Sequence, residues 1–295
     1  MTEIIVLIGF GEAGHGIGRG LAREGVAVRT YDIKLPTRQG IEMRAKAGEA
    51  QVAAYDALAP AIAGATIVLS AVVASEAIAA AATAAPHLTG GQAYVDLNSV
   101  SPATKRAVGE AIAASGASFA EAAVMARVKP HGHQVPMLLA GHDAESLATR
   151  LNAIGMRTEA VGDKIGQASA NKMLRSIMIK GIEALLIECL VAARRCGIEE
   201  RILSSVGETF PGIDWREAAS YYLGRTAMHG ARRVSEMEEV AATLAELDLE
   251  PIMAQAIAKR IGWAFAHLRE ATWQQGEPRN YQEILDRIDD NAARS

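Results

Sequence analysis

The chain has 295 residues, of which half are hydrophobic and 22% are charged, as in ordinary globular proteins. This length fits two domains and buries enough surface to exclude any need for disulfides or structural metals. The net charge of −4 and the lack of a dense basic run argue against a nucleic-acid partner. The start resembles no secretory signal, and the alanine-rich tract 67–85 contains Glu76, so we expect a cytoplasmic protein with no membrane contact.

The first 162 residues alternate β-rich runs with helical patterns. Strands are predicted at 4–9, 26–32, 66–71, 93–97, 118–123 and 135–140. A helix is predicted over 11–24, and further helical stretches separate most of the strands. This alternation predicts a doubly wound, mostly parallel α/β domain over residues 1–162.

After Gly162 the pattern becomes helical. Residues 163–196 contain no proline and repeat apolar residues at helical spacing, which predicts one helix of about nine turns over about 163–197. Later breaks fall near Pro211, Pro251 and Pro278. We therefore expect an all-helical domain over residues 163–295, entered by a long interdomain helix.

The two cysteines, Cys189 and Cys196, both fall within the predicted long helix. Their separation along a helix is too large for a disulfide. We expect them to be reduced core residues of a cytosolic protein.

The segment 9–14 reads G-F-G-E-A-G between the first strand and the first helix, the context that a dinucleotide-binding loop requires. Gly9 permits the tight turn, Gly11 lets a pyrophosphate approach the backbone, and Gly14 lets the helix pack on the sheet. The free N–H groups at the helix start attract phosphates. The predicted cofactor-binding residues of this Rossmann loop are Gly9, Phe10, Gly11, Glu12, Ala13 and Gly14. A tight turn without a ligand is the structural alternative.

Asp32 ends the second predicted strand. A carboxylate at this place accepts hydrogen bonds from ribose hydroxyls and repels a 2′-phosphate, which favours NAD over NADP. Lys34 and Arg38 follow closely and could favour the phosphate, so NADP stays open. A turn-forming aspartate is the alternative role for Asp32.

Three later segments read D-L-N-S-V-S-P at 96–102, E-A-A-V-M-A-R at 121–127 and G-Q-A-S-A-N-K-M-L-R-S at 166–176. With the glycine loop, they stand in the order of four motifs of the β-hydroxyacid dehydrogenases. The chain resembles this family, which includes 6-phosphogluconate and 3-hydroxyisobutyrate dehydrogenases, over most of residues 1–200. The resemblance implies hydride transfer between a nicotinamide and a small β-hydroxy acid or sugar acid. It also implies a homodimer formed through the helical domain.

The segment 96–102 resembles the family's D-x-S-T-x-x-P. The resemblance implies that Asn98 and Ser99 hold the substrate carboxylate, and that Asn98 also lies near the nicotinamide. Both side chains can donate the necessary hydrogen bonds. Ser101 and Pro102 are in addition a good helix start, which explains those two residues but not Asn98 and Ser99.

The segment 121–127 departs from the family's D-A-P-V-S-G-G, since Met125 and Arg127 replace small residues that bind substrate in the family. Arg127 could recognise a carboxylate with two parallel hydrogen bonds. It could equally be a solvated surface arginine. The departure predicts a substrate different from those of the well-known members.

The segment 166–176 resembles the family's G-x-G-x-x-x-K-x-x-N-N. The resemblance makes Lys172 the general acid/base at the reacting hydroxyl. Arg175 and Ser176 replace the family's asparagines and follow Lys172 by about one helical turn, so they could also reach the substrate. Outside the motif, Lys172 would be read as a lysine that extends its ammonium into water.

A later helical segment places His229, Arg232, Arg233 and Glu236 at spacings typical of one helix face. His229 and Arg233 are candidates for binding a carboxylated substrate. The alternative is an exposed charged face with an Arg232–Glu236 pair. His131 and His133 are expected in a surface loop without metal-ligand partners, so no metal is predicted.

The predicted function is an NAD(P)-dependent dehydrogenase in which Lys172 takes the hydroxyl proton as the hydride leaves. Desolvation in a closed cleft would lower the pKa of this lysine toward neutrality. An imine reductase-like enzyme is one alternative, although such enzymes generally lack the lysine. A nucleotide-binding protein that lost the chemistry is the other, and the departures at Met125, Arg127, Arg175 and Ser176 keep it open.

Overall fold

The computed structural model describes residues 3–269, 271, 273 and 276–292. The chain divides into two compact units, Met1–Lys172 and Met173–Ser295. This division lies ten residues beyond the predicted boundary at 162, because the first residues of the long helix are bonded to the sheet of the first unit.

Among the described residues, eight strands form one sheet in the order β3-β2-β1-β4-β5-β6-β7-β8. Their bounds are β1 Ile4–Ile8, β2 Ala27–Tyr31, β3 Ala53–Tyr55, β4 Ile67–Ser70, β5 Ala93–Asp96, β6 Ser118–Val124, β7 Met137–Ala140 and β8 Thr158–Gly162. Neighbouring strands are parallel except for the antiparallel pair β6–β7. The predicted doubly wound, mostly parallel sheet is confirmed, with β3 and β8 as strands that the sequence analysis did not identify.

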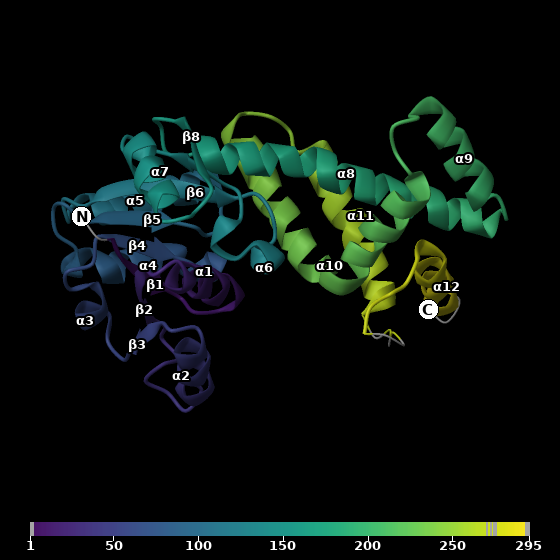
Figure 1. The fold of residues 1–295 in the computed structure, drawn as a ribbon. Coiled ribbons are helices and arrows are strands. Elements are labelled where there is room, and N and C mark those ends of the chain that lie inside the picture. The colour runs from purple at the N-terminus through teal and green to yellow at the C-terminus, as the bar shows by residue number, and fades with distance from the viewer. Residues whose placement is uncertain (1–2, 270, 272, 274–275, 293–295) are drawn as a thin grey trace. The chain divides into compact units, whose positions relative to one another are not determined.

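Both faces of this sheet are covered (Figure 1). The helices of the first unit are α1 Glu12–Arg23, α2 Gly40–Glu49, α3 Leu58–Ile62, α4 Ala77–Ala84, α5 Pro102–Ala113, α6 Val128–His131 and α7 Ala144–Ala153. Within β1, Ile5 and Leu7 enter one hydrophobic cluster. Val6 and Ile8 enter the cluster on the opposite face. A strand with apolar residues at every position is therefore buried on both sides.

The second unit is helical, as predicted. It contains most of α8 Gln167–Arg195, together with α9 Glu199–Thr209, α10 Trp215–Glu246, α11 Ile252–Leu268 and α12 Tyr281–Ala292. Gly197 has a left-handed φ of 68°, which ends α8 close to the predicted limit because a glycine there satisfies the last carbonyls at little cost. The chain within α10 departs from helical geometry at His229.

The two cysteines of the second unit differ from expectation. Cys189 and Cys196 are free thiols, but both are exposed, so the prediction that they lie in the core is wrong. Cys189 lies on α8 but outside the hydrophobic cluster of this unit, and Cys196 follows the end of α8. Within the described residues, no helix combines the length and the apolar character needed to cross a membrane.

Candidate active site and cofactor-binding loop

The glycine loop has backbone geometry that larger residues could not adopt. Gly9 follows β1 with a φ of 90°, and a Cβ there would lie 2.5 Å from the carbonyl oxygen of Ala71. A Cβ on Gly14 would lie 2.1 Å from the carbonyl oxygen of Gly9. Only glycine therefore allows α1 to start this close to the end of β1.

Gly11 differs from the other two glycines, because a Cβ added to it would meet no protein atom within 4 Å. It is the N-cap residue of α1, and no side chain caps this helix start. Glu12 and Ala13 occupy the first turn. Open space in front of uncapped N–H groups fits a pyrophosphate, and the positive end of the helix dipole would favour its charge.

Phe10 belongs to the loop only through its backbone. Its side chain is buried in the core of the first unit and contacts the His15 ring edge-on at 5.6 Å between centroids. The Phe10 side chain thus anchors the loop to the sheet.

Asp32 follows β2 and accepts two backbone hydrogen bonds. One carboxylate oxygen accepts from the Phe10 N–H at 2.9 Å, and the other accepts from the Lys34 N–H at 2.9 Å. The bond from the Lys34 N–H closes a turn, which is the alternative role predicted for Asp32. Each carboxylate oxygen still has a lone pair for a ribose hydroxyl, so the turn role and the cofactor role are compatible. Lys34 and Arg38 are both exposed.

Asn98 lies just beyond β5 and is 4% exposed. Its Nδ2 donates to the Ser70 hydroxyl at 3.2 Å and also to the Asp96 carboxylate. Its Oδ1 is buried, and among the described residues it has no hydrogen-bond partner. A buried acceptor without a donor is costly, and a donor such as the amide N–H of a nicotinamide would satisfy it.

Lys172 and Ser99 come from different motifs and meet in the first unit. The Lys172 ammonium donates a hydrogen bond to the Ser99 hydroxyl. Ser99 is exposed and Lys172 is partly buried. An amine and a hydroxyl are thus held together beside Asn98, where the resemblance places the reacting groups of the substrate.

Sequence analysis did not identify Lys105 and Glu121, two buried charged residues, as functional. The Lys105 ammonium, on α5, donates to the Asp96 carboxylate at 2.6 Å, to the Asp96 carbonyl at 2.8 Å and to the Ala122 carbonyl at 3.2 Å. Lys105 and Asp96 are both fully buried. The available signal was a lysine on the apolar face of a helix, because lysines are almost never buried without a partner.

Glu121, in β6, is the other buried charged residue that sequence analysis did not identify. Its carboxylate accepts from the backbone N–H groups of three residues at the start of α8. They are Gly166 at 2.6 Å, Ala168 at 3.0 Å and Ser169 at 3.3 Å. The signal in the sequence was an acidic residue inside an otherwise apolar strand.

Met125 and Arg127, the two residues that depart from the family's third motif, have different surroundings. Met125 packs against a small cluster around Ala123, Ala140 and Ala168, and its N–H donates to the Pro136 carbonyl at 2.8 Å. Arg127 is exposed at the residue before α6. The substrate roles of both residues stay predictions, and the packing of Met125 is the better supported role for that residue.

In the second unit, Arg175 is exposed on α8, and Ser176 accepts a hydrogen bond from Lys180 at 3.2 Å. Arg233 is buried, and its guanidinium binds both carboxylate oxygens of Glu183. The alternative of an exposed charged face holds for Arg232, which is 59% exposed, but is wrong for Arg233, which is 7% exposed. The physical reason is that adjacent residues on a helix point about 100° apart.

The Arg232–Glu236 pair is present at 3.8 Å. His229 lies where α10 leaves helical geometry, so the regular spacing assumed for it does not hold. The substrate role predicted for His229 remains a prediction.

The expectation that His133 lies in a surface loop is wrong. His133 is buried beside Gly20 and Gly155 rather than lying on a surface loop, with its Nε2 3.6 Å from the Glu24 carboxylate. In the part of the chain that the structure describes, no group of three or more His, Cys, Asp or Glu residues could hold a metal ion.

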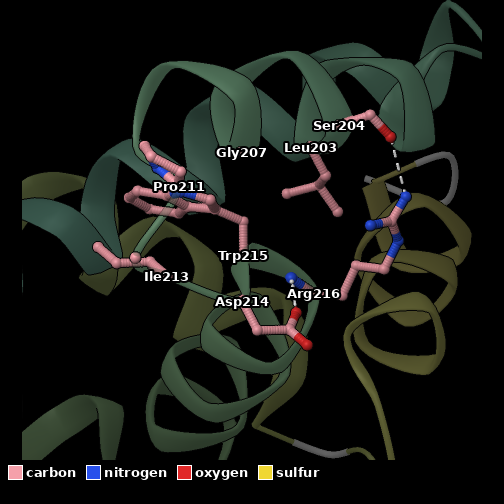
Figure 2. Close-up of a pocket in the computed structure, with 9 residues that line it drawn as sticks. Leu203, Ser204, Gly207, Pro211, Ile213, Asp214, Trp215 and Arg216 are labelled. Atoms are coloured by element: carbon pink, nitrogen blue, oxygen red, sulfur yellow. Dashed lines mark hydrogen bonds between the residues drawn. The ribbon is translucent and has the colours of Figure 1, made fainter.

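A cavity of about 390 Å³ lies in the second unit, around the connection between α9 and α10. Figure 2 shows Arg216 reaching Ser204, and Asp214 bonded to the backbone at the start of α10. Asp214 thus caps α10 and Arg216 binds Ser204, and none of these residues belongs to the predicted motifs.

Comparison with known proteins agrees with this geometry. Residues 4–162 match the family described as the NAD binding domain of 6-phosphogluconate dehydrogenase. The chain belongs to this family. An NAD-binding domain is therefore present, and the family is dehydrogenase-like. Residues 193–263 match a domain of unknown function.

Three solved structures share the architecture of this family member. A conserved hypothetical protein from Sinorhizobium meliloti 1021 is 46% identical, with a TM-score of 0.84 over 99% of this chain and 97% of that chain. The conserved protein MTH1747, described as structurally similar to 3-hydroxyacid dehydrogenases, is 32% identical, with a TM-score of 0.74 over 98% of both chains. The 3-hydroxyisobutyrate dehydrogenase of Mycobacterium tuberculosis is 15% identical, with a TM-score of 0.76 over 97% of this chain and 99% of that chain. The last likeness shows the shared fold alone.

Proposed function

We propose that this protein is an NAD-dependent oxidoreductase that transfers a hydride between the nicotinamide and a small β-hydroxy acid or sugar acid. The observation that carries the proposal is the Lys172–Ser99 pair next to the unsatisfied Oδ1 of Asn98. Ser99 and Asn98 follow β5 and the glycine loop follows β1, and the parallel strand β4 lies between them. Carboxyl ends of parallel strands meet at one edge of a sheet, which is where such folds bind their cofactors.

The residues of the first unit fit the cofactor. Gly11 leaves room for the pyrophosphate at the start of α1, and Asp32 has lone pairs for the ribose hydroxyls. Ile33 and Val73 are apolar side chains with exposed fractions of 69% and 67%. They follow β2 and β4, which flank β1. We propose that these two side chains contact the adenine.

The preference for NAD over NADP rests on Asp32. Its carboxylate would repel a 2′-phosphate at short range, whereas Lys34 and Arg38 are exposed side chains on a turn and their attraction is weakened by solvent.

Lys172 has the central chemical role in the proposal. The bound nicotinamide supplies the hydride acceptor. Lys172 takes the proton from the substrate hydroxyl, and in the reverse direction its ammonium donates to the carbonyl oxygen. Ser99 holds the Lys172 amine in place through its hydroxyl oxygen, and its O–H donates to the substrate carboxylate. Asn98 already donates its amide N–H groups to Ser70 and Asp96, so it contributes its free Oδ1 to the nicotinamide amide instead. Arg127, exposed after β6, is the candidate for a second carboxylate contact.

The helical unit supplies the proposed homodimer interface. Leu174, Met178 and Leu185 are exposed on one face of α8, where their spacing of four and seven residues aligns them. Exposed apolar stripes of this kind are typical of surfaces that contact another protein. The cytoplasmic location also stays a proposal, consistent with the two free thiols.

The proposal is tested first by cofactor binding and then by turnover. NADH and NADPH titrations followed by fluorescence should show tighter binding of NADH. A panel of hydroxy acids and sugar acids should yield a substrate with NAD reduction. For that substrate, Lys172→Ala should lower kcat by about 10²–10⁴-fold, the usual contribution of a general acid/base.

The matched control is Lys164→Ala, which removes an exposed lysine eight positions earlier and should leave kcat unchanged. Turnover by Lys172→Ala within about threefold of the wild type would reject the mechanism. NADH binding without turnover of any hydroxy acid would favour the nucleotide-binding protein that has lost the chemistry. Turnover of cyclic imines that does not need Lys172 would favour the imine reductase-like alternative.

A further inference from the structure

We propose that Glu121 is a positioning residue that sets Lys172 against Ser99 by holding the start of α8 on the sheet. The proposal rests on the function assigned above to Lys172, and it concerns residues of the first unit only. Under this proposal, the buried Glu121 carboxylate affects the position of a reacting group in addition to the stability of the fold.

The first step is the contact between Glu121 and α8. One carboxylate oxygen of Glu121 accepts from the N–H groups of Gly166 and Ala168, and the other accepts from the N–H group of Ser169. These donors belong to the first turn of a helix, whose N–H groups have no partners within the helix. The negative charge also lies at the positive end of the helix dipole. Glu121 is therefore a cap supplied by a strand distant in sequence.

The second step is the short, rigid connection from this cap to the reacting amine. Lys172 follows Ser169 by three residues within α8, which is less than one helical turn. A helix transmits a shift at its start directly to the next turn, because its backbone bonds leave little freedom. The location of the Lys172 ammonium therefore depends on where Glu121 holds the helix.

The third step is the anchoring of Ser99. Asp96 and Glu121 are register partners on the adjacent strands β5 and β6, and both are fully buried. Asp96 is bound by the Lys105 ammonium and by the Asn98 amide, and Ser99 follows three residues after Asp96. Lys105 also binds the Ala122 carbonyl, next to Glu121. The two halves of the Lys172–Ser99 pair are thus fixed to neighbouring strands, each through a buried carboxylate.

The experiment measures the Lys172 amine directly and needs no substrate. Trace acetic anhydride labels lysines in the full-length protein between about pH 6 and pH 11, a range that brackets the ordinary lysine pKa. Mass spectrometry then gives the labelling of Lys172 relative to exposed Lys164 at each pH. In Glu121→Ala, we expect the relative labelling of Lys172 to change by about threefold or more, because loss of the cap frees the amine from Ser99.

A second variant tests the same contact without a cavity. Glu121→Gln keeps the oxygen that serves Gly166 and Ala168 but places an N–H₂ group against the Ser169 N–H, so its effect should be smaller and in the same direction. The control is Asp214→Ala, which removes the carboxylate that caps α10 in the second unit. It should leave the Lys172 profile unchanged.

The outcomes separate this proposal from the proposed function. An unchanged Lys172 profile in folded Glu121→Ala overturns the positioning role, even if the variant melts at a lower temperature. If that variant does not fold, the unchanged profile of Glu121→Gln overturns it instead. NADH binding, measured by fluorescence on the same samples, should stay within about twofold of the wild type, because the glycine loop is held by other contacts. A wild type that binds no NADH refutes the cofactor assignment and leaves the labelling result standing.

Discussion

Several buried charged side chains of this protein lie against a side chain of opposite charge. In the second unit, burial raises the pKa of Glu183, and the Arg233 guanidinium opposes this shift. Burial lowers the pKa of Lys180, and the Glu236 carboxylate, 3.0 Å away, opposes that shift. Partners of opposite charge offset much of the cost of desolvation. These residues therefore stabilise the helical unit only as pairs.

Substitution of Arg233 tests this dependence. Arg233→Leu leaves the Glu183 carboxylate buried without its cation, and we expect the free energy of unfolding to fall by about 3–5 kcal/mol. Arg232→Leu, its exposed neighbour, should cost less than about 1 kcal/mol. Urea denaturation of both variants provides the measurement. Equal, small losses would show that the Arg233–Glu183 pair contributes nothing beyond a surface ion pair.

At the scale of elements, the turn from β1 to α1 shows how one motif serves both packing and binding. Gly9 and Gly14 are required by neighbouring backbone atoms of the protein itself. Gly11 faces open space, so the fold alone does not explain why it is a glycine. An approaching pyrophosphate does explain it.

Alanine substitutions should separate the two kinds of glycine. Gly11→Ala should keep the stability of the protein within about 0.5 kcal/mol of the wild type, and it should weaken NADH binding because its Cβ enters the space for the phosphates. Gly14→Ala should lower the free energy of unfolding by about 1–3 kcal/mol, as overpacking usually does. Thermal unfolding and NADH titration measure the two effects. Wild-type NADH affinity in Gly11→Ala would contradict the assigned phosphate site.

At the scale of the whole molecule, the exposed apolar residues of α8 are the feature that bears on oligomeric state. The exposed apolar residues of α8 belong to a unit that already has a hydrophobic core of its own. Met178 and Leu185 are 67% and 65% exposed, and burial of such side chains in a second copy would remove apolar surface from water.

A charge on this stripe tests the proposed homodimer. Met178→Glu should shift the protein from dimer to monomer, because a carboxylate buried between two apolar faces has no partner. Light scattering after size-exclusion chromatography gives the mass of both forms. Ile41→Glu, at an exposed apolar residue of α2 in the first unit, serves as the control and should keep the wild-type mass. A monomeric wild type would refute the proposal at once.

Local patterns in the sequence were enough to predict the fold class and the cofactor loop. The short apolar β-rich runs, the helical spacing after Gly162 and the glycine spacing at 9–14 depend on neighbours within a few residues. The two strands that were missed have weaker patterns, since β3 has only three residues and β8 is only partly buried. Six of the eight strands could thus be read from sequence.

Tertiary structure alone decided which polar groups far apart in the chain became partners. The sequence showed Glu121 and Lys105 only as charges in apolar surroundings, and folding joined them to α8 and to Asp96. Arg233 is buried and binds Glu183 while its neighbour Arg232 is exposed, because adjacent residues on a helix point about 100° apart and only the packing of α10 decides which of them is buried. Contacts between residues far apart in the chain leave no periodic signal in the sequence. The hydrogen bonds from the start of α8 to Glu121, which precede Lys172 on the same helix, could therefore be identified only in the folded protein.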